Sequence, residues 1–324
     1  MRKIAFINNK GGVGKTASVT TMAHMLWKLH GKKVLVVDMD PQSNASAMFT
    51  DTLWMNLMFS ILPDEFCALS SEQKDDLYRA EMQEKLASLP KDWSDDQKRE
   101  YLEELQLSVE DLLLDNDMDP HRVIRHTKYE GLDIIQAQLT LAEAEGRLKA
   151  DVVIPQQYKL REQLKKIEDE YDYCLIDCSP SISLLNINAL VAADEIYIPM
   201  RCDGNSAIGC AISLQLITNV RQFYRPDIKV DGIFFTQYNT QANVSKVVEE
   251  LLASIMTNVE ILPFKIGRSK LLEENTYEQL PLLDVDAGKN KTKVTLAYMD
   301  LVEYIMAPNK KKFLKEYQQR TVEE

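Results

Sequence analysis

A short glycine-rich stretch near the start of the chain holds residues that could bind phosphate. Gly11, Gly12 and Gly14 allow the backbone to fold so that successive amide N–H groups point the same way. Lys15 and Thr16 follow directly. In this order, the lysine is expected to contact the β- and γ-phosphates of a nucleotide, and the hydroxyl to ligate Mg²⁺. The predicted loop consists of Lys10, Gly11, Gly12, Val13, Gly14, Lys15, Thr16 and Ala17.

The loop departs from the general phosphate-loop pattern, because position 9 is an asparagine where a glycine is usual. It also contains a second lysine, Lys10. Since Lys15 already serves the chain's own nucleotide, Lys10 is not needed for that purpose. Lys10 could act on phosphate in a role other than binding the chain's own nucleotide, or it could be a solvated charge on the loop. The residues alone leave both interpretations open.

Two kinds of element must position this loop. An apolar run over 4–7 predicts a strand before it, and apolar residues at helical spacing from Val19 to Leu26 predict a helix after it. A second apolar run ends at Asp38 and Asp40, and a third ends at Asp177. Strand ends carry the ligand-binding groups in open α/β sheets, so these carboxylates are expected beside the loop. The alternative for the first pair is a strand-end turn before a proline.

The alternation of strands and helices predicts one doubly wound, mostly parallel α/β sheet with helices on both faces. We expect a single domain over 1–308, an acidic helical insertion at about 54–108, and a basic, polar tail over 309–324. The predicted strands after the first two are 131–137, 171–178, 195–199, 229–235 and 260–263. The predicted helices after the first are 139–150, 156–170, 183–193, 206–223, 242–256 and 292–306.

Composition narrows the function classes. The net charge is −12, but residues 51–120 carry 19 acidic and 6 basic side chains, so the remainder has a net charge of about +1 and leaves room for a basic face. No apolar run is long enough to span a bilayer, and the first residues read as a strand and not as a signal peptide. The five cysteines lack zinc-type spacing and suit a reducing compartment.

Three segments together resemble the ParA/MinD group of ATPases. The loop Lys10–Thr16 has the deviant Walker A form of that group, with its extra lysine. The run DMDPQSN from Asp38 is similar to the second signature of the ParA branch, D-x-D-P-Q-G-N, and the run DCSPS from Asp177 resembles the third. The resemblance covers about 1–53 and 109–306. The resemblance does not include the insertion. Because the phosphate loop comes near the first residue, we expect no long N-terminal region of the kind that carries a helix-turn-helix in larger plasmid partition ATPases.

The resemblance implies an ATPase that uses ATP and Mg²⁺ and closes into a homodimer with ATP between the subunits. In the family, the lysine at the position of Lys10 contacts the partner's nucleotide, and the carboxylate at the position of Asp40 positions the attacking water. The implied catalytic residues are Lys10, Lys15 and Asp40, and the implied metal ligands are Thr16, Asp38 and Asp177. Pro199, Met200 and the segment Gln237–Asn239, which includes Tyr238, lie where the family holds adenine.

The ParA branch also binds nonspecific DNA through basic residues late in the chain, and a ParB-type centromere-binding partner triggers hydrolysis. The chain is thus expected to be a bacterial, plasmid or phage partition ATPase in the cytoplasm, associated with the nucleoid. Candidate DNA contacts are Arg221, Arg225, Lys246, Arg268 and Lys270, with Lys289, Lys291 and Lys293 behind them.

Three alternatives remain at this point. The tail from Lys310 is basic and slightly amphipathic, which allows a MinD-like membrane-associated ATPase, although Phe313, Leu314 and Tyr317 form only a small apolar face that Glu316 interrupts. A nucleotide-dependent scaffold without turnover is disfavoured, because pure binding needs no water-orienting carboxylate. A small-molecule kinase or amidoligase is disfavoured by the DPQSN run.

Overall fold

A computed structural model gives the three-dimensional structure of the chain. It describes residues 1–50, 94, 97, 107–150, 155–239, 243–255 and 258–323. The predicted helical insertion at 54–108 therefore lies almost entirely outside the described residues.

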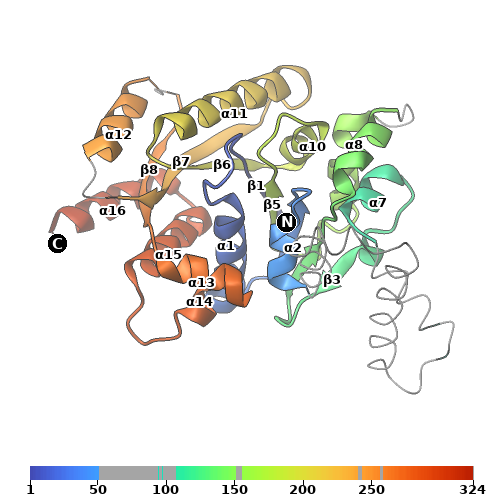
Figure 1. Cartoon of the computed structure of the whole chain (residues 1–324), viewed down its shortest axis with the longest axis horizontal. Coiled ribbons are helices and arrows are strands. Elements are labelled where there is room, and N and C mark those ends of the chain that lie inside the picture. Colours follow the sequence, from blue (N-terminus) through green and yellow to red (C-terminus); the bar gives the residue numbers. More distant parts are fainter. Residues whose placement is uncertain are drawn as a thin grey trace, which may run out of the picture.

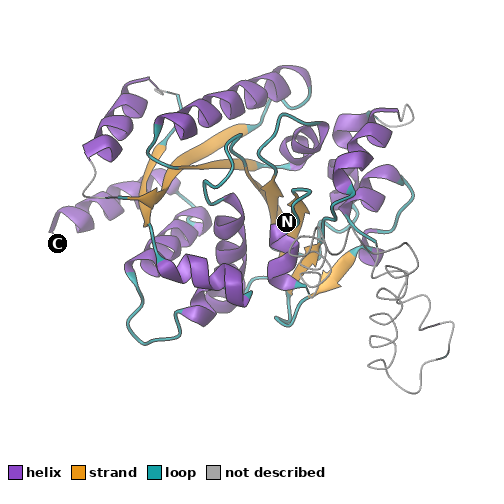
Figure 2. Cartoon of the chain, in the orientation of Figure 1, coloured by secondary structure: helices purple, strands orange, loops and turns teal. Residues whose placement is uncertain are grey.

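The described chain forms one sheet of eight strands in the order β3-β4-β2-β5-β1-β6-β7-β8. Neighbouring strands are parallel, except that β3 runs antiparallel to β4. This confirms the predicted doubly wound, mostly parallel α/β fold (Figure 2). The strands are β1 (Arg2–Phe6), β2 (Val34–Met39), β3 (Ile124–His126), β4 (Leu132–Ile135), β5 (Tyr173–Cys178), β6 (Glu195–Met200), β7 (Lys229–Tyr238) and β8 (Ile261–Gly267).

Alternate residues of each central strand enter two separate cores, one on each face of the sheet. In β1, Ile4 and Phe6 enter one core, while Ala5 enters the other. The first core is covered by α1 (Lys15–His30), α2 (Asn44–Phe49), α13 (Lys270–Glu278), α14 (Leu282–Val285), α15 (Lys293–Met306) and α16 (Lys310–Glu323). The second is covered by α7 (Val109–Leu114), α8 (Leu141–Ala150), α9 (Lys159–Lys165), α10 (Leu184–Ala192), α11 (Gly204–Phe223) and α12 (Asn243–Ile255). Figure 1 shows α11 and α12 on one side of the sheet and α1, α14 and α15 on the other.

Several short elements escape sequence prediction. Strand β3 and helices α2, α7, α13 and α14 are present in addition to the predicted ones. The helix predicted over 156–170 is shorter, because a 3-10 turn at Gln156–Tyr158 precedes α9, which ends at Lys165. The strand predicted over 260–263 extends to Gly267.

The segment expected as a C-terminal tail forms helix α16 and packs against the first core. Leu314 is buried, and the Tyr317 ring lies 5.0 Å from the ring of Phe264. The ring of Phe313 lies 6.0 Å from that of Tyr304. The apolar residues that a membrane-binding tail would present thus pack against the protein's own core, with Leu314 buried and Phe313 and Tyr317 half-buried. None of the described helices combines the length and the apolar character that crossing a membrane requires.

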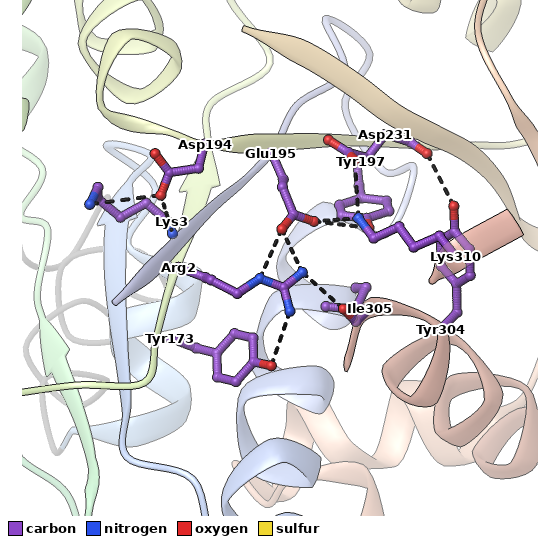
Figure 3. Close-up of polar contacts among 10 residues, drawn as sticks. All are labelled: Arg2, Lys3, Tyr173, Asp194, Glu195, Tyr197, Asp231, Tyr304, Ile305 and Lys310. Carbon is purple, nitrogen blue, oxygen red and sulfur yellow. Dashed lines mark hydrogen bonds and ion pairs between the residues drawn. The ribbon is translucent and has the colours of Figure 1, made fainter. Parts of the chain in front are cut away.

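An ion-pair cluster ties α16 to the amino-terminal edge of the sheet (Figure 3). The ammonium of Lys310 lies 2.5 Å from Glu195 Oε2 and 3.0 Å from Asp231 Oδ1. Arg2 also pairs with Glu195, at 2.5 Å. Burial opposes ionisation of Glu195, but hydrogen bonds from Lys310 and Arg2 outweigh it and lower the pKa of this carboxyl group. The cluster therefore joins β1, β6, β7 and α16 near the amino-terminal ends of these strands. The predicted loop lies at the other end of the strands.

Candidate nucleotide-binding site

The predicted phosphate loop connects the carboxyl end of β1 to helix α1. Gly12 and Gly14 have φ values of 70° and 79°, in the left-handed region that glycine adopts without a Cβ penalty. Gly14 is the N-cap of α1. The amide groups of the loop therefore lie next to the positive end of the helix dipole, and both attract an anion. The local sequence thus builds the anion-binding turn that its glycines predict.

Lys15 lies inside this turn. Its side chain is buried, and its ammonium donates to the carbonyl oxygens of Asn8 at 3.0 Å and Lys10 at 3.2 Å. Burial lowers the pKa of Lys15, while the charges of Asp177 and Asp40 act in the opposite direction. The Lys15 ammonium therefore lies at the start of a helix, where it can bind the phosphate groups of a nucleotide.

The two strand-end carboxylates Asp38 and Asp177 are directly opposite each other on β2 and β5. Thr16 donates its hydroxyl proton to Asp177 Oδ2 at 2.6 Å, and the other oxygen, Oδ1, is buried without a hydrogen-bond partner. Burial, followed by the charge of Asp38, raises the pKa of Asp177 well above its ordinary value. Burial also raises the pKa of Asp38 to about 6, against the hydrogen bonds that Ser46 donates.

An unpartnered buried carboxylate oxygen beside a threonine hydroxyl fits Mg²⁺. This ion is usually held by one or two protein oxygens together with substrate phosphates. Among the described residues, no group of three or more His, Cys, Asp and Glu side chains is arranged to hold a metal by itself. The predicted ligands Thr16, Asp38 and Asp177 come together, and a nucleotide would complete the coordination.

Asp40 lies just past β2, where it accepts a hydrogen bond from the amide of Gln42 at 3.0 Å. Sequence reasoning assigned no role to Ser46, yet its amide and hydroxyl both donate to Asp38 Oδ2, at 2.8 and 2.7 Å. Ser43 has a φ of 54°, at the position where the family signature has glycine. That signature therefore encodes a backbone turn that sets Asp40 beside the loop.

The predicted adenine residues support the loop with their backbone or lie beside it. The carbonyl of Pro199 accepts a hydrogen bond from the side-chain amide of Asn8 at 2.9 Å, and that of Met200 accepts one from the Thr236 hydroxyl at 3.3 Å. The Tyr238 hydroxyl donates to Glu249, and its ring is buried. The contact of these residues with adenine stays a prediction.

The end of β7 holds the glycine-rich half of the loop, a contact that sequence reasoning missed. The Thr236 hydroxyl donates to the carbonyl of Val13 at 2.8 Å, and the Gln237 side-chain amide donates to that of Gly12 at 3.1 Å. These two hydrogen bonds fix the backbone that carries the loop amide groups, which are the groups expected to bind phosphate.

Helix α11 supports the other half of the loop. Its Gly209 approaches Asn8 and Lys10 so closely that a Cβ there would lie 2.7 Å from Asn8 Oδ1. The nearby Ser213 hydroxyl accepts a hydrogen bond from the amide of Asn9 at 2.8 Å. A glycine inside a helix costs about 1 kcal/mol relative to alanine, so its presence here needs a packing reason, and the close approach supplies one.

Lys10 lies at the outer part of the loop with a partly exposed side chain. Its amide donates to Asn8 Oδ1 at 3.0 Å, which fixes the local backbone. Within the described part of the chain, the Lys10 ammonium forms no ion pair. This position is compatible with a contact to a group outside the chain.

The basic residues predicted to contact DNA differ in their exposure and in whether their charged groups already have partners within the chain. Lys246, Arg268 and Lys270 are exposed, although Arg268 lies 3.6 Å from Glu273. Arg221 donates to the carbonyl of Ile228. By contrast, Arg225 donates to the carbonyls of Val191 and Ala193 and pairs with Asp194 and Asp227, which ties its guanidinium to the fold.

A phosphate loop between the first strand and first helix of a doubly wound sheet, facing strand-end carboxylates, defines a P-loop nucleotide triphosphatase. Residues 1–230 match the AAA_31 family, described as an AAA domain. The chain belongs to this family.

Relatives refine this class. The chain is 28% identical over 305 residues to the sporulation initiation inhibitor protein Soj of Bacillus subtilis, covering 94% of this chain and 98% of that protein. It is 28% identical over 288 residues to the chromosome-partitioning ATPase Soj of Treponema pallidum, covering 88% and 90%. These similarities confirm the predicted resemblance to the ParA/Soj type, and the chain is an ATPase of that type.

The fold is shared with cobyrinic acid a,c-diamide synthase of Mycobacterium smegmatis, solved with a bound ATP analogue and magnesium. That structure matches with a TM-score of 0.66 at 24% identity, covering 94% of each chain. At this level of identity the similarity concerns the fold alone.

The buried carboxylates predict an unusual stability response. Because the pKa values of Asp38 and Asp177 are higher in the folded chain, the folded state holds their protons more tightly. Their contribution to stability therefore falls as pH rises from about 4, and for Asp38 this continues to about pH 6. We expect Asp177→Asn to raise the Tm of the nucleotide- and metal-free protein at pH 7.5 by roughly 2–4 °C, the shift that about 1 kcal/mol gives in a large domain.

Differential scanning calorimetry at pH 5.5 and 7.5 tests this expectation, with exposed Asp169→Asn as the control. The gain for Asp177→Asn should be smaller at pH 5.5, where the wild-type carboxyl groups hold more protons. A Tm at pH 7.5 equal to or below the wild-type value would contradict the assignment.

Proposed function

We propose that this chain is a partition ATPase in which ATP binding joins two copies into a dimer that binds DNA without sequence preference, and in which hydrolysis releases the dimer. A ParB-type protein bound at a centromere site is the proposed trigger of hydrolysis. The partition role is supported by the similarity to the chromosome-partitioning ATPase Soj of Treponema pallidum. The nucleoid is then the cellular location.

Each residue of the site has a proposed task. The loop amides and Lys15 hold the phosphates, and Thr16, Asp38 and Asp177 hold Mg²⁺, which neutralises phosphate charge when bound. Asp40 orients the water that attacks the γ-phosphate. Its backbone position is fixed by the turn at Gln42 and Ser43, so the carboxylate is aimed before substrate arrives.

The observation that carries the proposal is the position of Lys10. Two lysines share one loop, but only Lys15 is drawn into the turn by the carbonyls of Asn8 and Lys10. The Lys10 side chain is partly exposed on the same loop, and its ammonium is proposed to lie beside phosphate charge that builds up in the reaction. A cation there stabilises that charge most strongly across a closed, water-excluded interface. A second copy of the chain supplies such an interface.

The DNA surface is proposed to use Lys246, Arg268 and Lys270, which are exposed, with Arg221 as a further contact. Arg225 contributes less, because its guanidinium is held by carbonyls and carboxylates. Dimer formation would double these charges on one particle. Phosphate contacts of this kind give sequence-tolerant affinity that falls steeply with salt.

Lys10→Ala tests the dimer directly. We expect the variant to bind ATP with wild-type affinity, because Lys15 and the loop amides remain, but to stay monomeric with ATP and Mg²⁺. Wild-type protein should become a dimer under the same conditions. Sedimentation velocity measures the association, and fluorescence titration with a labelled ATP measures the binding.

Lys33→Ala is the matched control, because its side chain is exposed on a loop away from the site. It should dimerise like the wild type. Equal dimerisation of the Lys10→Ala protein would remove the proposed role of this lysine.

A further inference from the structure

Helix α11 contacts the nucleotide loop through Gly209 and Ser213, and we propose that these two residues position Lys10 for its contact with a second copy of the chain. The inference rests on the proposed function, because it gives both residues a role in the ATP-dependent dimer. They are positioning residues, since neither is expected to contact the nucleotide.

Gly209 acts through the absence of a side chain. A Cβ at this position would lie 2.7 Å from Lys10 Cβ and 3.0 Å from the Lys10 amide nitrogen. Carbon atoms in good contact are about 3.5–4.0 Å apart, so the backbone of Lys10 would have to move by about 1 Å. A side-chain rotation cannot relieve this overlap, because one of the contacted atoms belongs to the backbone.

Ser213 acts through its hydroxyl, one helical turn further along α11. The hydroxyl is buried, donates to the carbonyl of Gly209 at 2.8 Å and accepts the amide hydrogen of Asn9 at 2.8 Å. The residue before Lys10 is thereby tied to the same helical turn that Gly209 allows to approach. The two contacts together set the direction in which Lys10 leaves the loop.

The rest of the loop has separate supports. Thr236 and Gln237 bind the carbonyls of Val13 and Gly12 from the end of β7. Lys15 does donate to the carbonyls of Asn8 and Lys10, but it does so from a flexible four-carbon side chain that can follow a 1 Å shift. A change in α11 should therefore displace Lys10 while the phosphate-binding half of the loop stays in place.

The predicted phenotype separates binding from assembly. We expect Gly209→Ala to bind ATP like the wild type, to fail to dimerise with a non-hydrolysable ATP analogue and Mg²⁺, and to lose about 100-fold in kcat. A misplacement of about 1 Å in a reacting group has a cost of this order. Ser213→Ala, which adds no bulk, should change dimerisation and kcat in the same direction but less.

The experiment uses the full chain and compares both variants with Gly204→Ala. Gly204 begins the same helix, and a Cβ there meets no atom within 4 Å, so this variant tests the effect of an added methyl group alone. Fluorescence titration with labelled ATP, sedimentation velocity with the analogue, and phosphate release with DNA present give the three readouts.

The outcomes distinguish this inference from the proposed function. If wild type and Gly204→Ala dimerise and both α11 variants also dimerise normally, the inference is wrong and the proposed function stands. Joint loss of ATP affinity and dimerisation in both variants also overturns the inference, because α11 would then support the whole loop. If Gly209→Ala does not fold, Ser213→Ala decides. If wild type stays monomeric, the proposed function fails and the inference fails with it.

Discussion

We expect the Lys15→Gln protein to lose ATP binding. Lys15 is the buried cation of the loop, and its ammonium faces Asp177 and Asp40. A charge-assisted hydrogen bond contributes about 1.5–3 kcal/mol, so losing contacts to two phosphates weakens binding by at least about 100-fold. The uncompensated carboxylates would in addition repel the triphosphate.

Isothermal titration with ATP and Mg²⁺ measures this loss. Lys149→Gln is the control, since Lys149 is exposed and its i,i+4 ion pair with Glu145 is expected to contribute little to stability. Unchanged affinity in the Lys15→Gln protein would refute the assignment of the phosphate loop.

The second large effect is expected for Asp40→Ala. Removing the water-orienting carboxylate should lower kcat by about 10²–10⁴-fold while ATP, Mg²⁺ and the dimer interface remain. The variant should therefore accumulate as an ATP-bound dimer that binds nonspecific DNA. Gel filtration with ATP and Mg²⁺, with and without DNA, measures both properties, and Asp117→Ala on an exposed turn is the control.

The DNA affinity of this trapped dimer should fall steeply with salt. The logarithm of the binding constant should change linearly with that of salt concentration, with a slope of about −0.9 for each phosphate contacted. Charge reversal at Lys246 and Lys270 should weaken binding and flatten this slope. A monomer that ignores ATP, or a dimer that does not bind DNA, would contradict the proposed function.

The parts of the site that are local in sequence could be predicted. Gly12 and Gly14 occupy left-handed conformations that glycine alone adopts freely. The positions of these glycines therefore predict the turn. The meeting of Asp38 and Asp177 could be expected from the rule that parallel strands end at one edge of the sheet, and their register places them opposite each other.

Other parts gave no signal because they depend on contacts distant in sequence. Gly209 looks like a weak point in a helix until its approach to Lys10 is known. Strand β3 has three residues, which is too short for a period-two pattern to stand out. Ser46 is one serine among many, and only the fold brings its hydroxyl to Asp38.

The packing of the basic C-terminal segment in α16 also depends on contacts distant in sequence. The sequence shows a basic segment with a small apolar face of Phe313, Leu314 and Tyr317. In the structure Leu314 is buried, and the rings of Phe313 and Tyr317 lie against those of Phe264 and Tyr304. A small apolar face of this kind can pack on the protein's own core or on a membrane, and hydropathy alone does not distinguish the two.

The ion pairs of Lys310 limit where the chain can be shortened or fused to another protein. A stop codon just before this residue would leave Glu195 with Arg2 as its ion-pair partner and would remove the ion pair that Lys310 makes with Asp231. It would also uncover the aromatic rings beneath the last helix. Unpaired charges and exposed aromatic rings favour aggregation and degradation of the protein. Fluorescent fusions and purification handles therefore belong beyond residue 323 on a spacer, and shortened versions should keep the final helix.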